Sequence, residues 1–250
     1  MTNNNTIKHV VVVEDEDDLR ETVAFQLEMR GLQVRSARDA SEALKLLEER
    51  MPDVVLTDLK MPGMDGLGLL DAVRKNKGPS PAVILMTGMT EFELADGYNR
   101  GLDAIITKPF EGTVLEDAVI HCMLPIPERW SESNSNSQAP RARLTLNFPQ
   151  SLNQLISENR FRIGRGGLAL RMSKDFHLRT QTELDLSFRF ESGTPNRLSL
   201  SGIVRWLRSS KSDPSTRLCG IEFTSLNSEM SELVQKLSQE SGTSAFIPIL

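Results

Sequence analysis

Acidic, hydroxyl and basic side chains follow short apolar segments in the first half of the chain. Glu14 and Asp15 follow the first of five such segments, Asp58 ends the third, Thr87 ends the fourth and Lys108 follows the fifth. If the segments are parallel strands, their ends meet in one cleft. Three crowded carboxylates repel one another, and hard oxygen ligands of this kind suit Mg²⁺. An adjacent hydroxyl and ammonium could hold phosphoryl oxygens, so the pattern predicts phosphoryl chemistry at Asp58.

The segments between these residues predict the elements that must position them. Strands are expected at 10–13, 32–37, 54–58, 82–87 and 104–107. Helices are expected at 17–30, 40–50, 66–75, 91–100 and 113–123. Alternation of strands with helices is typical of βαβ units, and consecutive apolar positions indicate a sheet covered on both faces. Residues 1–124 are therefore predicted to form an α/β doubly wound, five-stranded parallel sheet.

The second half of the chain has a different pattern. Residues 125–140 predict a flexible linker, because they include a polar, repetitive, proline-flanked stretch at 131–140. Residues 141–241 hold several alternating or β-rich segments, which predict a small barrel or sandwich, followed by one helix at 228–239. The C-terminal tail, 242–250, ends in the apolar stretch 245–250, which could dock on a partner or on its own barrel, and we favour the second.

Four motifs at the predicted strand ends resemble those of the CheY-like response-regulator receiver family. They are Val11–Glu16, Asp58–Gly66, Met86–Gly88 and Thr107–Phe110. The resemblance implies a flavodoxin-like fold in which Asp58 accepts a phosphoryl group from a histidine kinase or a small phosphodonor. It implies that Mg²⁺ is held by Glu14, Asp15, Asp58 and the carbonyl of Lys60. It also implies that Thr87 moves toward the phosphoryl group and that Lys108 bridges to it.

One position departs from the usual receiver pattern, and two others bear on the lifetime of the phosphoryl group. Ile105 stands where the family usually has a switch aromatic, three residues before Lys108. Isoleucine has no ring that could turn inward after phosphorylation. We therefore expect phosphorylation to work, but we leave open whether the usual aromatic switch transmits it. Lys60 and Met89 stand where side chains tune the attack of water on the acyl phosphate, and neither orients water. We therefore expect self-phosphorylation, slow self-dephosphorylation and no other enzyme activity.

Residues 139–241 resemble a PilZ domain, which implies a six-stranded barrel with a C-terminal helix. The residues that carry the resemblance are Gly202–Trp206, Cys219–Leu226 and the glycine-rich turn in Ile163–Leu170. Many PilZ domains bind cyclic di-GMP through an Arg-x-x-x-Arg pair and an Asp/Asn-x-Ser-x-x-Gly turn. The chain keeps neither motif intact, so we interpret the domain as an atypical member.

The departures lie at the nucleotide-binding positions. Arg141-x-Arg143 replaces the arginine pair, while Arg162 and Gly164 replace the acid or amide and the serine of the turn. Guanine recognition needs an acceptor, and arginine has none. If cyclic di-GMP binds, Arg141 and Arg143 are the expected contacts, and Arg162 and Arg165 add positive charge nearby. If it does not bind, we interpret Arg162 and Arg165 as part of a solvated strand face.

Charge and composition exclude other classes of protein. The 250-residue chain has a net charge of −5, with −9 in residues 1–124 and +4 in residues 125–250. This mild positive charge and the lack of a recognition helix argue against DNA binding. Two cysteines, the lack of a signal peptide and the absence of a long apolar run predict a cytoplasmic protein without a membrane span. An aspartate-based phosphatase would need an acid at position 60, where Lys60 stands.

We therefore expect a two-component response regulator whose barrel acts through a downstream protein partner. The sequence leaves open whether cyclic di-GMP also binds and whether the chain forms a homodimer. The alternative is a phospho-regulated scaffold whose degenerate PilZ barrel binds no nucleotide.

Overall fold

The computed structural model describes residues 8–75, 80–88, 91–130, 141–210, 213–241 and 243–250. The chain forms two compact units. The first contains residues 1–89 and 102–124, and the second contains residues 90–101 and 125–250.

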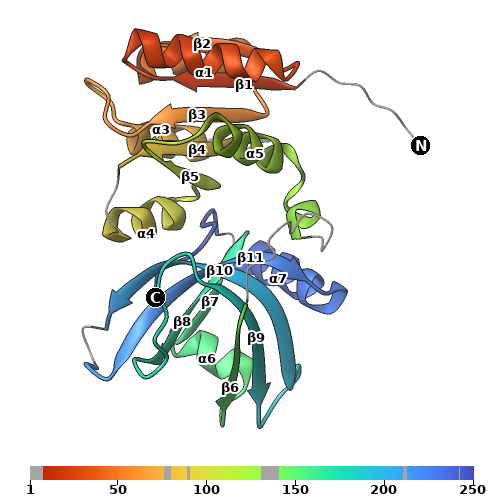
Figure 1. Cartoon of the computed structure of the whole chain (residues 1–250). Coiled ribbons are helices and arrows are strands. Elements are labelled where there is room, and N and C mark those ends of the chain that lie inside the picture. Colours follow the sequence, from red (N-terminus) through yellow and green to blue (C-terminus); the bar gives the residue numbers. More distant parts are fainter. Residues whose placement is uncertain (1–7, 76–79, 89–90, 131–140, 211–212, 242) are drawn as a thin grey trace. The chain divides into compact units, whose positions relative to one another are not determined.

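The first unit is a five-stranded parallel sheet with helices (Figure 1). Its strands are β1 (His9–Val13), β2 (Gln33–Ala37), β3 (Val54–Asp58), β4 (Ala82–Thr87) and β5 (Ala104–Thr107). Its helices are α1 (Asp17–Met29), α2 (Ala40–Glu49), α3 (Gly66–Lys75) and α5 (Gly112–Met123). The strand order is β2-β1-β3-β4-β5. The predicted doubly wound sheet is thus confirmed.

Apolar residues on both faces of the strands explain why the sheet is covered on both sides. In β1, Val11 and Val13 belong to a core that includes residues of α2 and α3. Val10 and Val12 belong to a second core, which includes residues of α1 and α5. Since successive side chains of a strand point to opposite faces, a run of valines supplies both cores at once.

The second unit contains a curled six-stranded sheet (Figure 1). Its strands are β6 (Ala142–Phe148), β7 (Phe161–Ile163), β8 (Gly167–Ser173), β9 (Glu183–Phe190), β10 (Arg197–Ser209) and β11 (Thr216–Leu226). Its helical segments are α4 (Glu91–Arg100), the 3₁₀ helix η1 (Ile126–Trp130), α6 (Leu152–Ser157) and α7 (Ser228–Ser241). Neighbouring strands are antiparallel except for the parallel pair β6–β9.

The strand order β6-β9-β10-β11-β8-β7 makes this sheet a curled half-barrel, which is the form that the predicted six-stranded barrel takes. The six strands and the C-terminal helix were predicted correctly. Helix α6, which the sequence analysis missed, lies in the chain between the two edge strands. It begins with a capping box, in which the Ser151 side chain accepts a hydrogen bond from the Gln154 N–H.

The start of the predicted linker differs from the expectation. Residues 126–130 form η1, and Trp130 is buried in the half-barrel core, with its ring edge-on to Phe223 at a centroid distance of 5.8 Å. Burial of an indole ring is a large apolar gain, so this segment is anchored despite its position before the polar stretch. Residues 131–140 lie outside the described residues. Helix α4, expected in the first domain, groups with the second unit, in which it contacts β10.

Candidate functional site

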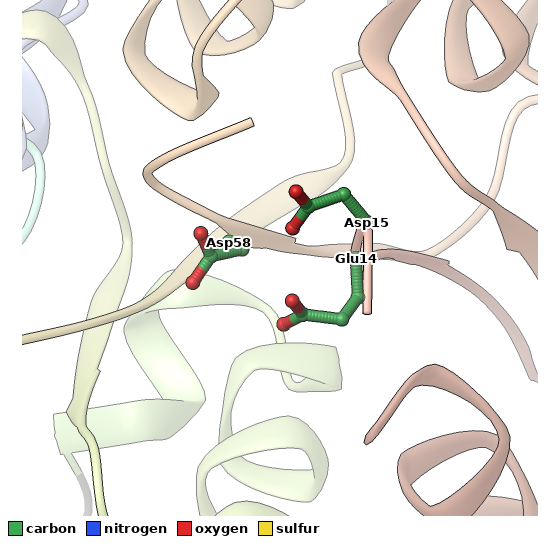
Figure 2. Close-up of side chains that lie close together, drawn as sticks. All are labelled: Glu14, Asp15 and Asp58. Carbon is green, nitrogen blue, oxygen red and sulfur yellow. The ribbon is translucent and has the colours of Figure 1, made fainter. Parts of the chain in front are cut away.

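The carboxyl ends of the central strands bring three acids together. Residue Val13 of β1 pairs with Thr57 of β3, so the residues that follow lie at the same sheet edge. One carboxylate oxygen each from Glu14, Asp15 and Asp58 lies within 4.8 Å of the others. Figure 2 shows the three carboxylates facing a common space. The convergence predicted from the sequence is therefore present in the structure.

Burial differs among the three acids. Glu14 and Asp58 are 2% and 7% exposed, whereas Asp15 is exposed to solvent. The guanidinium of Arg20 donates a 2.8 Å hydrogen bond to the Glu14 carbonyl oxygen, and it also pairs with Asp17. The Arg20 side chain, in the first turn of α1, therefore anchors the backbone of the segment that carries Glu14 and Asp15.

Lys108 lies between two of the acids. Its Nζ is 2.5 Å from Asp58 Oδ1 and 2.9 Å from Glu14 Oε2. Burial raises the pKa of Glu14; hydrogen bonding to Lys108 opposes this rise, and the nearby charge of Asp58 adds to it. Burial works to lower the pKa of Lys108, but its hydrogen bonds to Asp58 and Glu14 outweigh that effect and raise the pKa. The ammonium thus remains charged and neutralises part of the acidic cluster.

Thr87 and Lys108 are held at the same edge by strands β4 and β5. Thr87 pairs with Thr107, and the Lys108 N–H donates a 3.0 Å hydrogen bond to the Thr87 carbonyl oxygen. Thr87 is 4% exposed. A Cβ added to Gly88 would have no heavy atom within 4 Å, so the backbone after Thr87 borders open space.

The loop after Asp58 supports its carboxylate. The Lys60 N–H donates a 2.7 Å hydrogen bond to Asp58 Oδ2, and the Gly66 N–H donates to the Leu59 carbonyl oxygen at 2.9 Å. A Cβ on Gly66 would lie 2.3 Å from the Asp58 carbonyl oxygen, which leaves no room for a side chain. Gly66 is thus a positioning residue for which the sequence analysis gave no physical reason; its signal was a glycine at the start of a predicted helix.

The donor set fits a divalent cation. Three carboxylates offer hard oxygen atoms at one place, and one ammonium offsets only part of their charge. Two other predicted positions lie apart from this donor set in the sequence argument, Ile105 and Met89. Ile105 is half-buried beside the core formed with α2 and α3, and Met89 lies outside the described residues.

The candidate nucleotide-binding arginines of the second unit contact acids and carbonyl groups of the chain itself. Arg141 Nε is 3.3 Å from Glu183, and Arg143 Nε is 3.8 Å from Asp185. Arg162 and Arg165 donate hydrogen bonds to backbone carbonyl oxygens of the C-terminal segment. Arg143 lies on edge strand β6 and Arg141 directly precedes it, whereas Arg162 lies on β7 and Arg165 in the turn between β7 and β8, at the other end of the strand order.

A groove of about 760 Å³ lies elsewhere on the half-barrel. Its lining includes Arg160 and Arg171 but none of the four candidate arginines. Arg160 is 3.7 Å from Glu158, and Arg171 donates to Ser210 at 2.7 Å. The groove is therefore separate from the positions at which the sequence predicts nucleotide binding.

Comparisons with known proteins match the first part of the chain to one family. Residues 10–120 match the model of the response regulator receiver domain. The chain is 28% identical over 191 residues to the transcriptional regulatory protein CseB of Streptomyces avermitilis, which covers 76% of this chain and 77% of that protein.

Two solved structures resemble the same part of the chain. The receiver domain of NtrX from Brucella abortus is 35% identical, with a TM-score of 0.41, over 44% of this chain and 98% of that one. The chemotaxis protein CheY4 of Vibrio cholerae is 26% identical, with a TM-score of 0.45, over 47% of this chain and 99% of that one. Among the described residues, no helix combines the length and the apolar character that crossing a membrane requires.

Proposed function

We propose, from the premise that residues 10–120 are a response-regulator receiver domain, that Asp58 accepts a phosphoryl group from a histidine kinase and that this controls the second unit. The observation that carries the proposal is the cluster of Glu14, Asp15 and Asp58 in contact with Lys108. Each side chain has a charge and a position suited to one part of phosphoryl transfer.

In the proposed reaction, a carboxylate oxygen of Asp58 forms a bond to phosphorus. The phosphorus–nitrogen bond of the donor phosphohistidine breaks at the same centre, and its electron pair remains with the imidazole. The product is an acyl phosphate on Asp58. The ammonium of Lys108, which is 2.5 Å from Asp58 Oδ1, pairs with a phosphoryl oxygen, and the Thr87 hydroxyl donates to another.

Glu14, Asp15, Asp58 and the carbonyl oxygen of Lys60 would hold Mg²⁺. The bound ion supplies positive charge that offsets the acids and the incoming phosphoryl group. The fit rests on the three carboxylates within 4.8 Å of one another. We also propose slow self-dephosphorylation, because the exposed side chain at position 60 is a lysine, which cannot accept a proton from water while it is charged.

Incubation with acetyl phosphate and Mg²⁺, followed by intact-mass spectrometry, tests the acceptor. We expect one added phosphoryl group on the wild-type chain and none on Asp58→Asn. Asp117→Asn is the matched control, because it removes one exposed carboxylate from α5 outside the acidic cluster. Equal phosphorylation of Asp58→Asn and wild type would overturn the proposal, and so would a modified residue other than Asp58 in the peptide map.

The proposed output is a PilZ-like half-barrel that acts through a protein partner. The six strands and the C-terminal helix support the resemblance. CseB is named a transcriptional regulatory protein, but we retain the expectation that this chain does not bind DNA, because residues 125–250 carry only a mild net charge of +4. An electrophoretic mobility shift with genomic fragments at low salt would contradict this expectation.

A second candidate is a phospho-regulated scaffold whose half-barrel binds no nucleotide. It is favoured by the contacts of Arg162 and Arg165 with carbonyl oxygens of the chain, since these contacts use the donors that a phosphate would need. Calorimetric titration of cyclic di-GMP, with and without beryllofluoride and Mg²⁺, separates the candidates. Binding that Arg141→Ala abolishes would favour the nucleotide-responsive output, and no heat in either state would favour the scaffold.

A further inference from the structure

The C-terminal segment of the chain lies along the turn between β7 and β8. The N–H groups of Arg165 and Gly166 donate to the carbonyl oxygens of Ala245 and Phe246 at 2.9 and 3.0 Å. Arg165 Nε donates to the Ser244 carbonyl oxygen at 3.0 Å. These are contacts of backbone with backbone and of a cation with a carbonyl group, and they hold the peptide segment without regard to most of its side chains.

The glycines of the turn create the space that this segment fills. A Cβ on Gly166 would lie 2.0 Å from the Phe246 ring, and a Cβ on Gly164 would lie 2.6 Å from the Phe246 carbonyl oxygen. Phe246 is 2% exposed and Ile247 is fully buried. The shape of the turn therefore matches one aromatic residue of the C-terminal segment, which adds side-chain selectivity to the backbone contacts.

The opposite side of the same segment contacts helix α4. The Phe246 N–H donates to the Tyr98 carbonyl oxygen at 2.9 Å, and the two rings stack with a centroid distance of 6.3 Å. The Ile249 N–H donates to Asn99 Oδ1 at 3.0 Å. Arg165 also reaches the end of this helix through a 3.1 Å hydrogen bond to the Gly101 carbonyl oxygen. The segment thus makes hydrogen bonds on both of its sides, and the Phe246 ring contacts both the turn and Tyr98.

We propose that the turn Gly164–Gly167 is a peptide-binding site whose ligand is the chain's own segment Ser244–Ile249, and that this occupied site fastens helix α4 to the half-barrel. Because the segment is part of the same chain, it binds at a high effective concentration. The turn N–H groups and the guanidinium groups of Arg162 and Arg165 are engaged while the segment is bound, so an anion reaches them only after it leaves.

Tyr98 provides a direct probe, because it is the only tyrosine of the chain and is 3% exposed. The experiment measures the rate at which tetranitromethane nitrates Tyr98 in the native full-length protein, by peptide mass spectrometry. We expect Phe246→Ala and Gly166→Ala to raise this rate at least about tenfold, because both variants favour local opening of the segment. Hydrogen exchange at Arg165 and Gly166 should accelerate in the Phe246→Ala variant.

The controls separate release of the segment from general unfolding. Phe25→Ala removes an exposed ring from α1, and Gly112→Ala adds a Cβ that meets only the Gln26 side chain, so neither should change Tyr98 nitration. A synthetic peptide of residues 244–249, at about millimolar concentration, should restore protection in Phe246→Ala, as expected if it replaces a tethered ligand. The same peptide with alanine in place of phenylalanine should not.

Each result bears on the proposal in one direction. The proposal is supported if Phe246→Ala and Gly166→Ala nitrate rapidly at Tyr98 while the β9 amides of both variants stay protected from hydrogen exchange. Equal nitration rates in wild type and Phe246→Ala would overturn it, as would a peptide that fails to restore protection. These readouts do not depend on phosphorylation, so a failure here is distinguishable from a failure of Asp58 as the acceptor.

Discussion

Removal of the exposed acid of the cluster should stabilise the protein without magnesium. The Asp15 carboxylate lies within 4.8 Å of oxygens of Glu14 and Asp58, while Lys108 contacts the other two acids. Each like-charge pair at this distance costs about 0.9 kcal/mol in a water-like dielectric. Physiological salt reduces two such pairs to a total of about 1 kcal/mol. Asp15→Asn should therefore raise the free energy of unfolding by about 1 kcal/mol in EDTA.

Excess Mg²⁺ should reverse the order of stability of Asp15→Asn and the wild type. Asp15→Asn removes one charged ligand, and a tenfold loss of Mg²⁺ affinity would reduce the stabilisation by excess Mg²⁺ by about 1.4 kcal/mol. This loss exceeds the gain from relieved repulsion. The variant should thus unfold above the wild-type temperature in EDTA and slightly below it in excess Mg²⁺.

Differential scanning calorimetry of the full chain, in EDTA and in millimolar MgCl₂, measures both effects. For a unit of this size, 1 kcal/mol shifts Tm by about 4 °C. Asp117→Asn is the control, since it makes the same change in net charge at an exposed position of α5. The reasoning is refuted if Asp15→Asn melts below wild type in EDTA, or if Mg²⁺ raises the Tm of both proteins equally.

Three further perturbations test the fold. Burial acts to raise the pKa of Asp53, but hydrogen bonds, first from Lys8, outweigh burial and lower the pKa. The ionised Asp53 carboxylate therefore stabilises the folded state above the ordinary pKa of 3.8, and this stabilisation is lost as the pH falls through the lowered pKa. Asp53→Asn should therefore be less stable than wild type in urea at pH 7, and equal differences at pH 7 and pH 2 would contradict this. Burial raises the pKa of Cys219 to about 12, so its thiol should react with Ellman's reagent only after unfolding, and reaction in the native state would be inconsistent with the fold. Arg74→Met removes the partner of Asp103, which is 2% exposed, and should cost about 3 kcal/mol; a loss under 1 kcal/mol would show that the pair is unimportant.

The sequence determined the first sheet and its site because both depend on local patterns. The apolar run Val10–Val13 predicts a strand covered on two faces, and Glu14, Asp58 and Lys108 follow strands whose ends must meet if the strands are parallel. Spacing along the chain is enough to place these groups at one edge. The hydrogen bond from the Lys60 N–H to Asp58 and the tight contact of Gly66 required coordinates, because they depend on the path of a loop.

Only the tertiary structure shows which distant segments pack onto the half-barrel of the second unit. Trp130 lies next to a polar stretch and reads as part of a linker, yet it fills the half-barrel core because that core offers an apolar place for its ring. Phe246 and Gly166 are 80 residues apart, and no local periodicity relates a C-terminal tail to a turn. Their contact, and the attachment of α4 through Tyr98, follow from shape matching between distant segments, which becomes visible only when the chain is folded.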